Sequence, residues 1–230
     1  MAEKPPTSVK IAGTDAAILA ESDLFQLSCG VYGCTSNCCT KSAPIILNPY
    51  EIALMCRESR IRYEDPLDIV ETDRAKGFPL VMLPRDPSCY FWTGRGCRIY
   101  GARPLACRLF PLGRVFDNGR SHIVLPELNV CSGLAPAPSA NTVADYLRAQ
   151  DTSTLVQMAD RWIEFVNDIE LLQLPDKPVT SVAFHMLVYS PDTPPAVGHS
   201  DDTLPLEDRF IMRLATARDQ LPQFLLLQKK

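Results

Sequence analysis

The spacing of apolar residues in the C-terminal part of the chain is helical. One stripe of large apolar side chains recurs at helical intervals and predicts the buried face of a long helix. Its members are Leu155, Met158, Trp162, Phe165, Val166 and Ile169. Asp151 or Thr152 is predicted to cap this helix. A shorter stripe begins at Val143, and residues 205–220 predict a last helix.

The pattern before position 100 is more broken and predicts shorter elements. Asn48, Pro49 and Glu51 stand at the cap, first-turn and capping-box positions of a helix that we expect at about 49–60. Apolar runs interrupted by Gly and Pro over 66–100 predict small antiparallel strands.

Turn and breaker residues predict two further local structures. The Asp-Asn-Gly triplet at 117–119 lies between apolar residues and predicts a β-hairpin. Arg103-Pro104 predicts a short helix that continues through Cys107 and Phe110 and ends at Pro111.

The remaining segments are less regular. We expect residues 1–22 to form a partly helical lead-in, and Phe25 with Leu27 predicts a short strand. Residues 132–141, rich in Pro, Ala and Ser, indicate a linker, and 190–202 indicate a Pro-rich polar loop.

The predicted fold class is α+β. A small irregular cysteine-rich metal-binding domain over 23–135 is expected to contain a short antiparallel hairpin or sheet and helices. The lead-in 1–22 precedes it, and a mostly helical segment over 136–230 follows it.

Composition narrows the class of protein. The 230 residues carry a net charge of −4, so the molecule as a whole has no electrostatic footprint for nucleic acid. No apolar run approaches the length of a membrane span. The N-terminal residues lack the apolar run of a signal peptide. We therefore expect a cytoplasmic protein whose cysteines are not paired in disulfides.

Eight of the nine cysteines form two clusters that are typical of a metal site. They are Cys29, Cys34, Cys38, Cys39, Cys89, Cys97, Cys107 and Cys131. Thiolates in groups of four select zinc or iron–sulfur chemistry, and eight thiolates allow one site or two. Cys56 shares a helical face with Ile52 and is predicted to be a buried, inert thiol.

The spacing of the first cluster favours an iron–sulfur cluster over a zinc or iron ion. The pattern is C-x4-C-x3-C-C, close to the plant-type ferredoxin spacing, and the chain has no C-x2-C pair of the kind that zinc ribbons use. Cys38 and Cys39 are adjacent and cannot both reach one ion with relaxed geometry. We expect them to divide their roles.

The second cluster lies in a segment whose charged residues are all positive. Residues 87–116 contain five Arg and no Asp, Glu or Lys. Arg98, Arg103 and Arg108 are predicted to lie around the negative sulfurs as hydrogen-bond donors. The alternatives are an anion-binding patch for a carboxylate or phosphate and a solvated basic face. Among three scattered histidines, His122, His185 and His199, the first is the best supplementary ligand.

Three blocks carry a resemblance to a known family. They are Cys34-x3-Cys38-Cys39, then Ile46-Leu47-Asn48-Pro49-x-Glu51, and then Cys97-Arg98-Ile99-Tyr100-x2-Arg103-Pro104-x2-Cys107-Arg108-x-Phe110-Pro111. Over roughly 25–135 the chain resembles the YkgJ-type cysteine-cluster family, a zinc- or iron-chelating domain with a C-x2-C-x3-C-C signature. The first gap departs from that signature, with four residues between Cys29 and Cys34.

The same cysteine blocks look similar to those of a flagellin lysine N-methylase. That likeness implies an iron–sulfur cluster and S-adenosylmethionine, although no glycine-rich nucleotide loop follows a predicted strand.

The function predicted from the sequence is metal binding, by an iron–sulfur cluster or an iron or zinc ion. One alternative is a structural zinc module whose helical segment binds a protein partner. Others are an S-adenosylmethionine-dependent protein lysine N-methylase and a metal carrier with an exchangeable site. The sequence is compatible with an enzyme and with a non-catalytic metal-binding protein.

Overall fold

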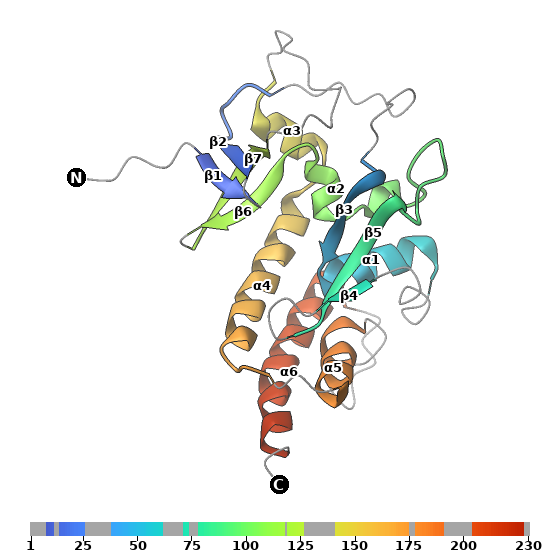
Figure 1. Ribbon diagram of the computed structural model, residues 1–230, viewed down its shortest axis with the longest axis vertical. Helices are drawn as coiled ribbons and strands as arrows, with labels where there is room; N and C mark the ends of the chain where they lie inside the picture. The colour runs from blue at the N-terminus through green and yellow to red at the C-terminus, as the bar shows by residue number, and fades with distance from the viewer. Residues whose placement is uncertain are drawn as a thin grey trace, which may run out of the picture.

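A computed structural model gives the fold. It describes residues 8–11, 14–25, 38–61, 71–73, 78–117, 119–126, 141–174, 178–190 and 204–227. The α+β prediction is confirmed, because these residues form helices and two small antiparallel sheets (Figure 1). The linker and polar loop predicted at 132–141 and 190–202 lie almost wholly outside the described residues, as does Leu27.

The first sheet has the strand order β1-β2-β7-β6. Its strands are β1 (Ser8–Ile11), β2 (Thr14–Leu19), β6 (Gly113–Asp117) and β7 (Arg120–Pro126). The predicted hairpin is confirmed, with Asp117 opposite Arg120 and a positive φ of 76° at Gly119. Glycine adopts this left-handed conformation at little steric cost.

The partly helical lead-in was a wrong prediction for the described part of 1–22. That part forms β1 and β2, and β2 pairs with β7 from Ala16 opposite Pro126 to Leu19 opposite Ile123. Ala16 is buried whereas Asp15 and Ala17 are exposed. A short run of Ala, Ile and Leu suits a helix or a strand, and the partner strand decides between them.

The second sheet has the order β3-β5-β4. Its strands are β3 (Thr40–Leu47), β4 (Glu71–Asp73) and β5 (Leu80–Ser88). The sequence predicted strands within 66–100 but not β3. Ile45 and Leu47 lie opposite Leu83 and Val81, and their side chains are buried. Towards Thr40 the pairing register shifts twice, so the cysteine end of this strand pair is irregular.

Helix α1 (Pro49–Ser59) follows β3 directly and begins where the sequence predicted. The Asn48 side chain accepts a hydrogen bond from Glu51 N at 3.0 Å, and the Glu51 carboxylate accepts one from Asn48 N at 3.0 Å. This reciprocal pair is a capping box. The short 3₁₀ helix η2 (Tyr100–Ala102) and the predicted helix α2 (Leu105–Leu109) follow later in the chain.

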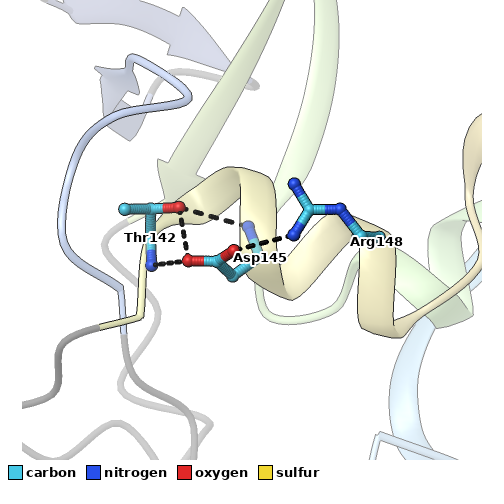
Figure 2. A network of polar contacts seen from close by, with 3 residues as sticks. All are labelled: Thr142, Asp145 and Arg148. Carbon is cyan, nitrogen blue, oxygen red and sulfur yellow. Dashed lines mark hydrogen bonds and ion pairs between the residues drawn. The ribbon is translucent and has the colours of Figure 1, made fainter.

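The C-terminal segment is helical, as predicted. Its elements are α3 (Val143–Ala149), α4 (Ser153–Glu170), α5 (Pro178–Phe184), the π-helix η3 (His185–Tyr189) and α6 (Leu206–Leu227). Figure 2 shows the start of α3, where Thr142 and Asp145 form a second capping box and Arg148 donates to Asp145 at 2.8 Å. None of the described helices is long and apolar enough to cross a membrane.

One hydrophobic core joins the helices to the second sheet. Phe184 stacks on Phe78 at 5.5 Å between ring centroids, and the Tyr189 hydroxyl donates to the Pro79 carbonyl at 3.1 Å. Phe165 of α4 is fully buried in the same core. The division at 1–22, 23–135 and 136–230 stays a prediction, although this core contains residues of the second and third parts.

Candidate metal centre

Five cysteines from both sequence clusters line one cavity of about 110 Å³. They are Cys38, Cys39, Cys89, Cys97 and Cys107. The rest of the wall is apolar and basic, from Leu83, Phe91, Trp92, Ile99, Tyr100, Pro104, Arg85 and Arg103. Tyr100 is half exposed, so this wall reaches the protein surface.

Strand pairing places the first three of these cysteines. Cys39 lies just before β3 and Cys89 just after β5, and Cys89 N donates to Cys39 O at 2.7 Å. Thr40 and Ser88, the next residues, are register partners in the sheet. Because Cys38 precedes Cys39, the irregular end of β3 and β5 brings all three cysteines to one edge.

A tight turn places Cys97. Trp92 and Cys97 form an isolated antiparallel bridge, and Arg98 N donates to Phe91 O at 2.9 Å. Thr93 closes the turn between them, with its backbone N–H donating to Gly96 O at 3.0 Å. Gly94 in this turn has a φ of 82°, which a residue with a Cβ rarely adopts.

Helix α2 places Cys107, and a buried carboxylate places α2. Glu51 is 4% exposed, and its Oε1 accepts a hydrogen bond from Leu105 N at 2.7 Å. Its other oxygen belongs to the capping box of α1. Burial raises the pKa of Glu51 from 4.5 to about 7, against the lowering effect of the two N–H donors. One side chain therefore joins the first turns of α1 and α2.

Arg85 and Arg103 supply the positive charge of the cavity wall. Arg85 donates from Nη1 to Cys38 O at 2.9 Å and from Nε to Ala43 O at 2.7 Å, which holds the segment before β3. Arg103 donates to Tyr100 O at 3.0 Å and to Gln150 Oε1 at 3.1 Å. Sequence reasoning included Arg103 but missed Arg85, whose one signal is its place shortly before Cys89.

The other two predicted arginines contact different groups. The Arg98 guanidinium lies over the rings of Tyr90 and Phe91, at 5.0 and 5.6 Å from their centroids. Arg108 donates to the backbone carbonyls of Gly101, Arg103, Gln150 and Asp151. Neither lines the cavity. Their predicted role beside the sulfurs stays a prediction.

The cavity thiols differ in acidity. A hydrogen bond with Cys39, assisted by Arg85, lowers the pKa of Cys38 to about 6, and the same hydrogen bond raises the pKa of Cys39. Burial raises the pKa of Cys107 to about 12 and also raises the pKa values of Cys89 and Cys97. The hydrogen bond within the adjacent pair therefore favours one thiolate and one neutral thiol over two thiolates.

Three of the predicted ligands, Cys29, Cys34 and Cys131, lie outside the described residues, as does His199. Among the described side chains, no three of His, Cys, Asp or Glu are arranged to hold a single metal ion. Cys56 on α1 and His122 on β7 do not line the cavity. His185 lies in the π-helix, and burial lowers its pKa.

The donor set fits a thiophilic metal or cluster, because soft sulfur ligands surround a cavity that also has two fixed cations. Residues 28–127 match the family model CxxCxxCC, described as "Putative zinc- or iron-chelating domain". Over these residues the chain is similar to the YkgJ-type cysteine-cluster family. All five cavity cysteines lie in the matched segment, and Cys131 lies just beyond it. No curated protein and no solved structure matches the chain.

Proposed function

We propose that this protein binds an iron–sulfur cluster through the cysteines that line the cavity, with Cys29 and Cys34 of the first cluster as further candidate ligands. The observation that carries the proposal is the convergence of five cysteines from two distant segments on one cavity. Metal binding as such agrees with the zinc- or iron-chelating description of the family.

The size of the cavity supports a group of several atoms. A single water-sized sphere needs only about 10–15 Å³ by the same measure. The cavity has about 110 Å³. Four sulfurs around one zinc ion lie about 2.3 Å from it, and no three described ligand side chains have such an arrangement. Sulfurs spread around a larger volume suit a cluster with its own inorganic sulfide.

The charge of the wall supports the same assignment. Several thiolates around iron leave a net negative charge, which is costly to bury without compensating cations. Arg85 and Arg103 provide fixed positive charge at this wall and hold nearby backbone through the contacts given above. Apolar neighbours such as Phe91 and Ile99 exclude water, which strengthens that compensation.

The deciding experiment is anaerobic purification followed by measurement of metal, acid-labile sulfide and visible absorbance. A brown protein that contains iron and sulfide is the expected result. A colourless protein with stoichiometric zinc would overturn the cluster and leave a zinc module. Iron without sulfide would instead leave a mononuclear iron site.

A matched pair of variants assigns the ligands. Cys97→Ser is expected to lose most of the bound iron, because a hydroxyl is a poor replacement for a thiolate at a soft metal. Cys56→Ser makes the same change at a half-buried thiol of α1 and should keep the iron content. Equal iron contents in the two variants would exclude Cys97 as a ligand.

A further inference from the structure

Exposed aromatic rings and arginines flank the cysteine cavity in pairs. Tyr90 and Tyr100 are each 51% exposed. The Arg98 guanidinium lies 5.0 Å from the Tyr90 ring centroid, and that of Arg103 lies 3.6 Å from the Tyr100 ring centroid. Arg95 is exposed in the turn beside them. We call these five residues the cavity rim.

The rim lies next to the cavity, because some of its residues line the cavity wall and others directly follow lining residues in the chain. Tyr100 and Arg103 themselves line the cavity wall. Tyr90 and Arg98 directly follow the lining residues Cys89 and Cys97. A molecule that covers the rim therefore lies next to the thiols.

The rim arginines lack acidic partners in the described part of the chain. None of Arg95, Arg98 and Arg103 forms an ion pair with a described carboxylate. Other arginines do, as in Arg114 with Asp160, Arg148 with Asp145, Arg161 with Glu164 and Arg218 with Asp168. Within the described residues the rim thus presents positive charge without an acidic partner, on a chain of net charge −4.

We propose that the rim docks an acidic segment of a partner protein over the cysteine cavity. The inference rests on the proposed function, since a partner at this position would lie next to the proposed cluster. An acidic partner is repelled by the acidic remainder of the molecule and attracted to the rim. This charge distribution orients the partner during its approach and raises the association rate.

The rim suits a protein segment better than a small anion. Tyrosine and arginine are the residues that most often anchor protein interfaces, because they give large contact area together with hydrogen bonds. A small anion gains nothing from two exposed rings. Inside the cavity it would also meet the negative charge of the proposed thiolate-bound cluster, so carboxylates are expected to remain at the rim.

Two fluorescent peptides of equal negative charge test the proposal, one alternating Glu with Leu and the other Glu with Ser. Binding to the purified protein is measured by fluorescence anisotropy. The Leu peptide should bind more tightly, and raising the salt from about 0.05 M to about 0.5 M should weaken both. Tyr90→Ala should reduce the preference for the Leu peptide without any change of charge.

Charge-reversal variants locate the binding surface. Arg95→Glu with Arg98→Glu should weaken the Leu peptide by about tenfold or more, because like charges then face each other. Arg120→Glu with Arg161→Glu makes the same change of net charge at exposed arginines on β7 and α4, and should weaken it by less than about twofold. Docking of a protein segment would be contradicted if the two double variants weakened binding of the Leu peptide equally. It would also be contradicted if free citrate competed with the peptide at the peptide's own concentration.

Metal and sulfide are measured in the same samples. If the protein contains no iron but still binds the peptide through the rim, the proposed function is wrong and the docking surface is supported. If the protein contains iron and sulfide but does not bind the peptide through the rim, only the docking surface is contradicted.

Discussion

Replacing Glu51 by Gln is expected to change how the stability of the protein depends on pH. This carboxylate is 4% exposed and accepts hydrogen bonds from Asn48 N and Leu105 N. Two opposing effects act on its charge, since burial favours the neutral acid whereas the two donors favour the ionised form. Burial has the larger effect and raises the pKa from 4.5 to about 7.

The sign and size of the effect follow from linkage. Between pH 4.5 and about 7 the folded protein holds a proton at Glu51 that the unfolded chain has released, so the free energy of unfolding falls as the pH rises. From about pH 5 to about pH 8 the loss amounts to about 2–3 kcal/mol. Glutamine cannot ionise and lacks this loss, but it leaves one of the two N–H donors unpaired, at a cost of about 1–3 kcal/mol at every pH.

Urea unfolding of both proteins over this pH range measures the difference in free energy of unfolding. The variant should be clearly less stable at low pH and close to the wild type at high pH. Glu58→Gln is the matched control, because it makes the same change at an exposed position of α1. A difference that is constant with pH would refute the raised pKa. A difference that grows with pH would show that the N–H donors outweigh burial.

Three other substitutions or treatments have expected outcomes of known direction. Phe165→Ala removes a fully buried ring that stacks on Trp162 and should lower the free energy of unfolding in urea by about 3–5 kcal/mol. A loss below about 1 kcal/mol would contradict the burial of this ring in the core. Thr142→Ala removes the cap of α3 and should cost about 1 kcal/mol, whereas Thr142→Ser should be nearly neutral. Removal of metal by a chelator should lower the midpoint temperature of thermal unfolding, because metal binding and folding are coupled. Calorimetry before and after the metal is restored measures this midpoint. An unchanged midpoint would show that metal binding does not contribute to the stability of the fold.

Elements set by neighbouring residues could be predicted from the sequence. The capping box of α1, the hairpin turn at 117–119 and the stripe of α4 each depend on contacts within a few positions. The strands β1 and β2 could not be predicted in this way. β1 pairs with β2, and β2 pairs with β7, which lies about a hundred residues away, so no local pattern encodes that contact.

The cysteine spacing indicated a metal site but not its architecture. It gave no reason to expect that the end of the β3–β5 pair would bring Cys39 beside Cys89, because β3 has no clear alternation where its register shifts. The arginine-rich segment pointed to charge near the sulfurs. It did not distinguish Arg103, which lines the cavity, from Arg98, which lies over the exposed ring of Tyr90.

Arg85 and Glu51 show why the remaining part of the site could not be predicted from local motifs. Each has a side-chain contact more than forty residues away in the sequence, to Cys38 O for Arg85 and to Leu105 N for Glu51. Irregular cysteine loops have few ladder hydrogen bonds of their own, so long-range polar contacts of this kind must fix them on the scaffold. The geometry of the thiols therefore depends on β5 and α1 as much as on the cysteine segments. Substitutions at these two positions should disturb metal binding even though neither side chain is a predicted ligand.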